Sequence, residues 1–245
     1  MKRFLTAALA ALCLLSLASC SSPGSPAASG TSSSSVSSSS QQGDTSSSDR
    51  PGPTPTVRQI AKERVAAMTL EEKVGQLFFV RCPADDAVSD VSKFHLGGYL
   101  LFGRDTKDKT ADDLIQTIAD YQTAAGDIPL LIGTDEEGGT VVRVSSNPNL
   151  RSEKFRSPQQ LYQSGGIEAV TEDAHRKDLL LQALGFNVNF APVADVSTNP
   201  GDFIYDRSFG QGAEPTASYV AAVVSRMHRD GMISTFTSVM PCSAL

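Results

Sequence analysis

The chain has 245 residues, with 21 Lys and Arg against 27 Asp and Glu, which gives a formal net charge of −6 at pH 7. This acidic balance excludes a protein that holds nucleic acid by neutralising its phosphates. Only four cysteines and three histidines are present and none has metal-ligand spacing, so the composition predicts neither a metal site nor a disulfide framework.

The first residues have the pattern of a secretion signal. Lys2 and Arg3 precede an apolar stretch from Phe4 to Leu17, which is too short to span a bilayer comfortably. The stretch ends in Leu17-Ala18-Ser19-Cys20, which resembles the lipobox of bacterial lipoproteins. We expect a lipoprotein signal peptide over residues 1–19 and a lipid anchor on Cys20, which would hold an exported, extracytoplasmic protein at the cell membrane. The alternative is an ordinary signal peptide with an incidental cysteine.

A serine-rich linker follows, over residues 20–56. Residues 21–50 contain fifteen serines in thirty positions and almost nothing apolar. Such a segment buries too little apolar surface to offset the entropy of ordering it. We expect a disordered tether that ends at three closely spaced prolines, Pro51, Pro53 and Pro55.

Helical and strand-like patterns alternate from residue 57 onward. Apolar residues at helical spacing predict helices, while short apolar runs between glycine or proline breaks predict strands. In chain order we expect a helix over 57–68, strands at 75–80 and 97–103, a helix capped by Thr110, a strand at 129–133, a helix over 166–184, a strand at 187–193, a helix over 215–230 and a strand at 232–236. A capping box at Thr69 to Glu72 marks a further helix start. This succession is typical of a parallel sheet covered by helices.

One acidic turn stands out because it directly follows the third expected strand. Asp135, Glu136 and Glu137 precede a double glycine, and Arg143 follows. No phosphate-binding glycine motif or nucleophile elbow is present, so we expect no cofactor. Carboxylate and guanidinium groups beside a glycine turn suit the binding of sugar hydroxyls. The alternative is an acidic surface loop with a glycine turn.

Five motifs occur in the order in which a known family carries them. They are Lys73-Val74-Gly75-Gln76-Leu77 and the segments 97–103, 135–143, 189–196 and 206–210. Together they resemble the N-terminal barrel domain of glycoside hydrolase family 3, on its β-N-acetylhexosaminidase branch. The resemblance covers about 57–236 and implies an incomplete TIM (β/α)8 barrel of the α/β class, with about five of eight strands.

The resemblance also implies roles for three residues. Asp135 would accept hydrogen bonds from sugar hydroxyls, and Arg143 and Arg207 would hold and orient the ring. The alternative for Arg207 is a salt bridge to Asp195 or Asp206. Glu136 and Glu137 do not form a catalytic pair in this interpretation, because neighbours on an extended segment point to opposite faces.

The family pattern is lost after residue 236. The family continues with Lys-His-Phe-Pro-Gly-His-Gly, which brings sugar-binding groups and the acid/base histidine, and its nucleophilic aspartate comes later still. Here residues 237–245 read Thr-Ser-Val-Met-Pro-Cys-Ser-Ala-Leu. The histidines at 95, 175 and 228 fall in or beside helices, where a surface or packing role is expected. We therefore predict no catalytic residue and no appreciable hydrolysis for this C-terminally truncated chain as written.

The function implied is that of a retaining glycosidase that removes terminal β-linked N-acetylglucosamine from glycans, with peptidoglycan as one source. Its partners would be the carbohydrate and, through the lipid anchor, the membrane. Two alternatives remain open at this point. One is a β-glucosidase-type hydrolase of the same family, and the other is a sugar-binding lipoprotein of an importer, with two α/β lobes.

Overall fold

The computed structural model describes residues 56–238. The signal peptide expected at 1–19, the lipid anchor at Cys20, nearly all of the linker and residues 239–245 lie outside this range. Within it, no helix combines the length and the apolarity that crossing a bilayer requires.

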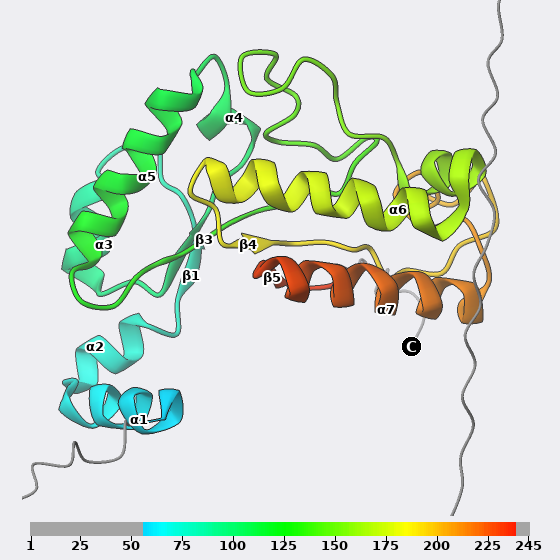
Figure 1. Cartoon of the computed structure of the whole chain (residues 1–245). Coiled ribbons are helices and arrows are strands. Elements are labelled where there is room, and N and C mark those ends of the chain that lie inside the picture. Colours follow the sequence, from blue (N-terminus) through cyan, green and yellow to red (C-terminus); the bar gives the residue numbers. More distant parts are fainter. Residues whose placement is uncertain (1–55, 239–245) are drawn as a thin grey trace, which may run out of the picture. The chain divides into compact units, whose positions relative to one another are not determined.

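Five short parallel strands form a single sheet (Figure 1). They are β1 (Phe79–Arg81), β2 (Gly98–Leu100), β3 (Leu131–Thr134), β4 (Val188–Asn189) and β5 (Ile233–Ser234). Their order in the sheet is their order in the chain, and every neighbouring pair is parallel. Right-handed crossovers that always advance in one direction place the connecting helices on one side of the sheet, which is the arrangement of a (β/α)8 barrel. The expected partial barrel of five strands is confirmed.

Seven helices accompany these strands in the described part of the chain. They are α1 (Val57–Ala67), α2 (Leu70–Gly75), α3 (Ala87–Phe94), α4 (Gly103–Thr106), α5 (Ala111–Ala125), α6 (Pro158–Ala183) and α7 (Ala213–Asp230). Side-chain capping boxes start four of them, at Thr56, Thr69, Thr110 and Ser157. The caps expected at Thr69 and Thr110 are thereby confirmed.

The prediction of a strand at 75–80 is wrong for most of these residues. The cap at Thr69 starts α2, which runs to Gly75, so the strand begins only at Phe79. A Cβ on Gly75 would lie 2.2 Å from the carbonyl oxygen of Phe94. This glycine is therefore needed for the close packing of α2 against the end of α3, not for a strand.

Two helices, α3 and α4, were not expected, and the helix predicted from 166 starts earlier. The structure begins it at Pro158, with non-helical dihedral angles at Gly165 and Gly166 that divide it. The second part coincides with the prediction and ends before Gly185, whose φ is 98°. Gly231, with φ 80°, ends α7 in the same left-handed conformation.

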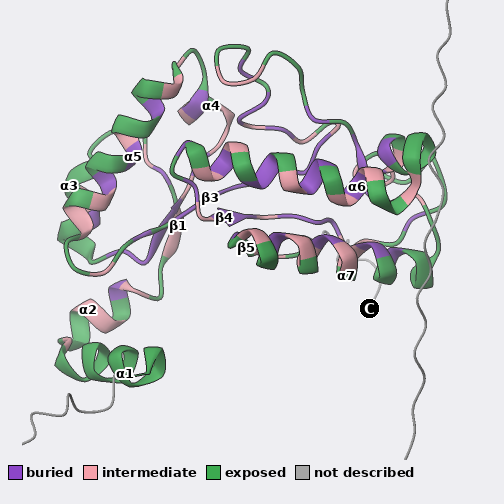
Figure 2. Ribbon diagram, viewed as in Figure 1, coloured by how far each residue is buried: buried purple, intermediate pink, exposed green. Residues whose placement is uncertain are grey.

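The hydrophobic core lies between the sheet and its helices (Figure 2). Tyr99 and Ile132 are partners in the register of β2 and β3, and both are fully buried. Tyr99 reaches α3 by donating its hydroxyl to the carbonyl of Ala87 at 2.7 Å, and its ring meets that of Tyr121 on α5 edge to face. This face of the sheet thus packs against α3 and α5.

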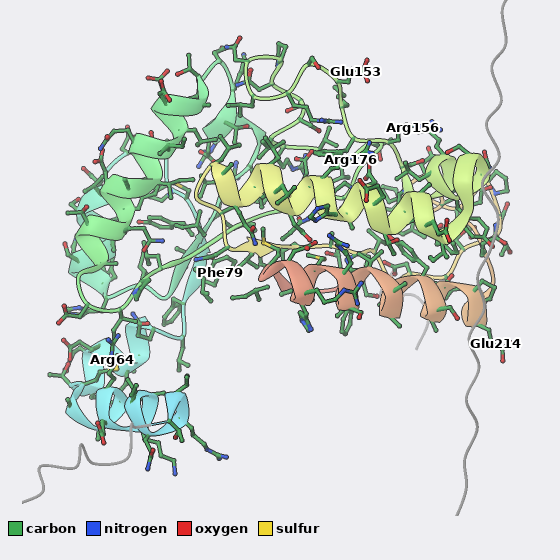
Figure 3. All side chains as sticks on the ribbon, in the orientation of Figure 1. Arg64, Phe79, Glu153, Arg156, Arg176 and Glu214 are labelled. Atoms are coloured by element: carbon green, nitrogen blue, oxygen red, sulfur yellow. The ribbon has the colours of Figure 1, made fainter. Side chains whose placement is uncertain are left out.

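The other face of the sheet is partly open. Phe79 (labelled in Figure 3) stacks on Phe190 with ring centroids 5.3 Å apart, over the position of Gly133. On the same face Leu131 is 41% exposed and Ile233 is 46% exposed. In a closed barrel this face is the packed interior.

The sheet also bears on the importer alternative. A single sheet of sequential strands does not match the two lobes of an importer's binding protein.

Candidate sugar-binding site

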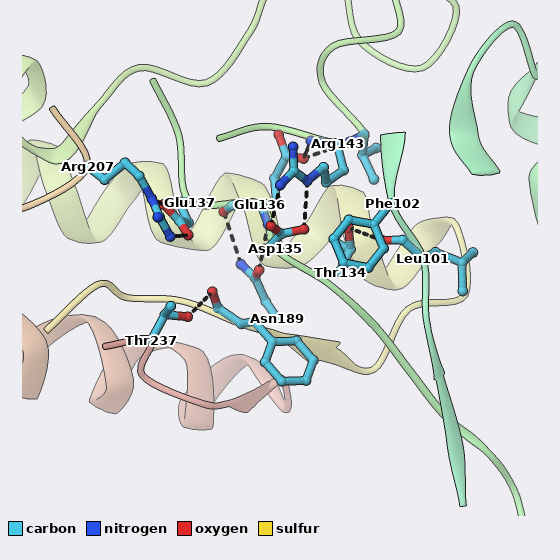
Figure 4. Close-up of polar contacts among 12 residues, drawn as sticks. Leu101, Phe102, Thr134, Asp135, Glu136, Glu137, Arg143, Asn189, Arg207 and Thr237 are labelled. Atoms are coloured by element: carbon cyan, nitrogen blue, oxygen red, sulfur yellow. Dashed lines mark hydrogen bonds and ion pairs between the residues drawn. The ribbon is translucent and has the colours of Figure 1, made fainter. Parts of the chain in front are cut away.

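The acidic turn lies where β3 ends, at the carboxyl edge of the sheet (Figure 4). Thr134, the last residue of β3, is buried and donates its hydroxyl to the carbonyl of Leu101 at 3.0 Å, which fastens the turn to the end of β2. Asp135, Glu136 and Glu137 follow at once. Ligands of α/β barrels bind at this edge, because all parallel strands present their loops there.

Asp135 and Arg143 form a two-pronged ion pair. The Arg143 guanidinium donates from Nε at 2.7 Å and from Nη2 at 2.6 Å to the two carboxylate oxygens of Asp135. The hydrogen bonds that Arg143 donates to Asp135, together with the Asp135 charge, raise the pKa of Arg143, although burial opposes this. Each carboxylate oxygen keeps a further lone pair, and both side chains remain partly exposed, so the pair can still bind hydroxyl groups.

Glu137 and Arg207 form a second such pair, deeper in the protein. Arg207 donates from Nε at 2.9 Å and from Nη2 at 2.7 Å to the Glu137 carboxylate, which is almost fully buried. Burial raises the pKa of Glu137, and the bonds from Arg207 only partly offset this effect. Arg207 therefore does form a salt bridge, but with Glu137, a partner that the alternative for Arg207, a salt bridge to Asp195 or Asp206, did not name. The charge of Asp195 also raises the pKa of Arg207, but less than Glu137 does.

Glu136 holds the backbone of the site. It is fully buried and accepts hydrogen bonds from the backbone N–H groups of Arg143 and Val144, both at 2.7 Å, and from the Ser145 backbone and hydroxyl. Asn189, at the end of β4, in turn accepts from the Glu136 N–H at 3.0 Å. Glu136 and Glu137 thus bind different partners, as expected for neighbours on an extended segment.

The double glycine is required by a close approach of two backbone segments. Gly138 and Gly139 have φ values of 101° and 70°. A Cβ on Gly138 would lie 2.3 Å from the carbonyl oxygen of Arg156, and one on Gly139 would lie 2.8 Å from the Ser157 side chain. The turn therefore packs directly against the segment that leads into α6.

Phe102 was not singled out in the sequence. Its half-buried ring lies beside the Asp135–Arg143 pair (Figure 4). The guanidinium carbon of Arg143 lies 5.5 Å from the centroid of this ring. The guanidinium carbon of Arg81, at the end of β1, lies 5.0 Å from the same centroid, so the ring packs against two cations. An aromatic residue directly before a glycine, close to the end of the strand expected at 97–103, was the available signal.

Thr237 and Ser238 follow β5, at the positions where the family pattern has lysine and histidine. Thr237 donates its hydroxyl to the carbonyl of Phe190 at 2.9 Å, and its backbone still pairs with Val193. Ser238 donates to the Asp195 carboxylate at 3.1 Å. This edge of the site therefore carries hydroxyl groups instead of cations.

The three histidines lie away from the acidic turn. His95 ends α3 with a φ of 51°, His175 lies in α6 with Nδ1 3.1 Å from Asp230, and His228 lies in α7 near Ser234. These positions agree with the surface and packing roles expected for them. In the described part of the chain, no cluster of three or more His, Cys, Asp or Glu could hold a metal ion.

A spacious cavity lies elsewhere. It measures about 680 Å³ and is lined by residues that precede the strands, among them Gln76, Leu96 and Ile128, together with Arg64 of α1. These residues belong to the amino edge of the sheet, opposite to the edge at which barrel enzymes bind their ligands. The acidic turn is therefore the better candidate site.

Comparison with known proteins identifies the family of this chain. The sequence pattern of the family described as "Glycosyl hydrolase family 3 N terminal domain" matches residues 69–237. "Beta-hexosaminidase LpqI" of Mycobacterium tuberculosis (strain ATCC 25618 / H37Rv) is 32% identical over 170 residues, which are 69% of this chain and 42% of that protein. "Beta-hexosaminidase A" of Pseudoalteromonas piscicida is 31% identical over 149 residues, covering 59% of this chain and 25% of that protein.

A solved structure shows the same similarity in three dimensions. The glycoside hydrolase family 3 beta-N-acetylglucosaminidase from Paenibacillus sp. str. FPU-7 superimposes with a TM-score of 0.63 at 32% identity, covering 70% of this chain and 33% of that one. In each of these three comparisons, the chain spans less than half of the length of its relative.

Proposed function

This chain belongs to glycoside hydrolase family 3 through its N-terminal domain, and from that premise we propose that residues 56–238 form the sugar-binding part of a glycosidase for terminal β-linked N-acetylglucosamine. The observation that carries the proposal is the Asp135–Arg143 pair at the carboxyl end of β3, with Arg207 held nearby by Glu137. The names of the relatives, beta-hexosaminidase and beta-N-acetylglucosaminidase, support this sugar class.

The proposed roles follow from the hydrogen-bonding capacity left at each group. Asp135 accepts from ring hydroxyls, since both of its oxygens keep a free lone pair. Arg143 retains Nη1 as a donor toward the sugar, because Asp135 occupies its Nε and Nη2. Arg207 orients the ring from the other side of the turn. These interactions bind the substrate in its ground state.

Bond cleavage needs groups beyond these. Retaining hydrolysis uses a nucleophilic carboxylate and a second group that first protonates the leaving oxygen and then activates water. The carboxylates of the acidic turn already have hydrogen-bond donors. Asp135 and Glu137 each accept from an arginine, and Glu136 accepts from backbone N–H groups. We therefore assign this part of the chain to binding, and we expect no appreciable hydrolysis by the 245-residue chain alone.

A chimaera tests the proposal. Residues 56–236 of this chain are joined to the segment of LpqI that follows the matched region, and hydrolysis of a chromogenic β-N-acetylglucosaminide is compared with that by the 245-residue chain. We expect activity only from the chimaera. An inactive but folded chimaera, or turnover by the 245-residue chain, would contradict the proposal.

The same chimaera separates the two specificities found in the family. Chromogenic N-acetylglucosaminide and glucoside substrates are supplied in parallel, and we expect the first to be hydrolysed faster. A preference for the glucoside would favour the β-glucosidase alternative. Calorimetry of the 245-residue chain with N-acetylglucosamine addresses the importer alternative, for which micromolar binding is expected.

We further propose that the protein is exported and held at the membrane by a lipid on Cys20. The lipobox-like Leu17-Ala18-Ser19-Cys20 supports this proposal, and the serine-rich linker would hold the folded part away from the bilayer. In a bacterial expression host, the wild-type chain should partition with membranes, whereas Cys20→Ala should not. Equal partitioning of both would contradict the anchor.

A further inference from the structure

Asp178 is a buried acid without a hydrogen-bond donor. It lies on α6 and is fully inaccessible to solvent. Neither of its carboxylate oxygens has a hydrogen-bond partner. An ionised carboxylate in such a place would lose its hydration without compensation, which is strongly unfavourable. The protonation state of Asp178 therefore needs an explanation.

A second acid supplies one. Asp230, the last residue of α7, lies against the same face of α6: its backbone carbonyl accepts a hydrogen bond from Gln182 Nε2 at 2.7 Å, and Gln182 and His175 lie one turn after and one turn before Asp178. Its carboxylate accepts a bond from Arg226 Nε at 2.8 Å and lies 3.1 Å from Nδ1 of His175. Two ionised carboxylates cannot bond to each other, because both are acceptors. If Asp178 carries a proton, its O–H can donate to Asp230 and the unpaired acid is satisfied.

The surroundings favour a neutral Asp178 and an ionised Asp230. Burial, followed by the Asp230 charge, raises the pKa of Asp178 from its usual 3.8 to about 7. Burial also acts to raise the pKa of Asp230, but the bonds from Arg226 and His175 outweigh it and lower that pKa. When two neighbouring acids have their pKa values driven apart, the proton resides on the one with the higher value.

The other charged or titratable groups near Asp178 come from three parts of the fold. They are Asp173, His175 and Lys177 on α6, Tyr219, Arg226 and Asp230 on α7, and Glu137 after β3. The remaining walls are largely apolar, and a cavity of about 20 Å³ beside Asp178 has room for about one water molecule. The cations next to Asp178 are already engaged, Lys177 by Asp173 at 2.8 Å and Arg226 by Asp230.

We propose that Asp178 and Asp230 form a carboxyl–carboxylate pair that holds one proton between α6 and α7 and makes the contact between these helices depend on pH. The step is a simple ionisation: the Asp178 O–H bond breaks, the proton passes to solvent, and two negative charges then face each other in the core. The resulting repulsion loosens the packing of α6 on α7.

Lys177 links this pair to the candidate sugar site. Its ammonium group donates to the backbone carbonyl of Glu137 at 3.0 Å, and Glu137 in turn holds Arg207. A new negative charge on the adjacent Asp178 competes for Lys177. Loss of the proton therefore also loosens the backbone that positions Arg207.

The sign of the pH dependence follows from where the proton is bound. Between about pH 4 and about pH 7 the folded state keeps a proton on Asp178 that the unfolded state has released. The stability that this proton provides is present at low pH and is lost as the pH rises toward 7. For one proton, the folding equilibrium constant falls by up to about tenfold per pH unit in that window.

The test is urea unfolding of the full chain at pH values from about 5 to about 8, for wild type and Asp178→Asn. Asparagine has nearly the same shape, can donate to Asp230 and cannot ionise. Asp112→Asn, at an exposed acid on α5, is the matched control. We expect the wild type and the control to lose stability relative to Asp178→Asn as the pH rises. A wild-type-to-variant difference that stays constant across the range would overturn the proposal.

Carbon NMR of the Asp178 carboxyl in the wild-type chain provides a second measurement, in case the variant does not fold. The proposal expects a titration midpoint near pH 7. A midpoint below about pH 5, within the ordinary range of aspartates, would overturn it.

Discussion

At the scale of single residues, the candidate site is a set of carboxylates that share one short turn but have different tasks. Asp135 faces the solvent edge with Arg143, Glu136 binds backbone N–H groups in the core, and Glu137 neutralises Arg207. Each task follows from which donors the fold brings within reach. Residue type alone does not distinguish the three acids.

The role of Asp135 can be tested in the chimaera described above. Asp135→Ala removes the acceptor of sugar hydroxyls and leaves Arg143 without its partner. We expect kcat/KM for the chromogenic N-acetylglucosaminide to fall by about ten- to a hundredfold. This is the loss that corresponds to the free energy of hydrogen bonds to a charged group. Asp112→Ala, on the outer surface of α5, is the control and should retain full activity. Equal losses in the two variants would remove Asp135 from the site.

Glu136 should matter for stability rather than for binding. Glu136→Gln replaces a carboxylate that accepts several hydrogen bonds by an amide whose NH₂ group opposes the backbone N–H donors. We expect a loss of about 2 kcal/mol in the free energy of unfolding, measured with urea. Glu153→Gln, at an exposed position (labelled in Figure 3), should change it by less than about 0.5 kcal/mol. A Glu136→Gln variant with an unchanged free energy of unfolding would show that the turn keeps its shape without this carboxylate.

At the scale of elements, the site depends on how closely its turn approaches the start of α6. The approach is possible only because Gly138 lacks a Cβ and adopts a positive φ. The same segment, Phe155 to Ser157, then leads into the capping box of α6. The turn and the helix are therefore fixed by one contact.

Gly138→Ala tests this contact. The added methyl group would lie 2.3 Å from the Arg156 carbonyl oxygen in a backbone conformation that alanine avoids. We expect a loss of about 2 kcal/mol or more in the free energy of unfolding. Gly103→Ala is the control, because nothing lies within 4 Å of its Cβ position and its φ is not positive. Similar losses at both positions would indicate a general effect of glycine replacement.

At the scale of the whole described fold, the open face of the sheet is the main feature that a closed barrel would not have. Leu131 and Ile233 lie on that face and are each more than two-fifths exposed. Apolar surface of this kind favours association between molecules. The other face, by contrast, packs against the helices through buried side chains such as Tyr99 and Ile132.

We therefore expect the chain to self-associate through this face. The double variant Leu131→Ser with Ile233→Ser should lower the apparent mass measured by light scattering at a fixed concentration. Leu179→Ser, at an exposed leucine on the helix α6, is the control and should leave the mass unchanged. Association that persists in the double variant, or that the control also abolishes, would place the contact elsewhere.

Much of the fold could be predicted because its signals are local. The capping boxes at Thr69 and Thr110, the apolar stripe that became α5 and the glycine ends of α6 and α7 each depend on residues a few positions apart. The strand at 75–80 was placed too early because Gly75 is followed by an apolar run. Only the packing of Gly75 against the end of α3 shows that it closes a helix.

The amino-acid sequence by itself determined the order of helices and strands, the family, and the acidic turn with Asp135, Arg143 and Arg207 as candidates, because these depend on residue type and spacing. Only the tertiary structure decided that Arg207 pairs with Glu137, that Glu136 binds backbone, and that Asp178 meets Asp230 between two helices. Such pairings join residues up to 70 positions apart. They form where strands and helices converge, so the partner of a charge depends on packing that spacing along the chain does not encode.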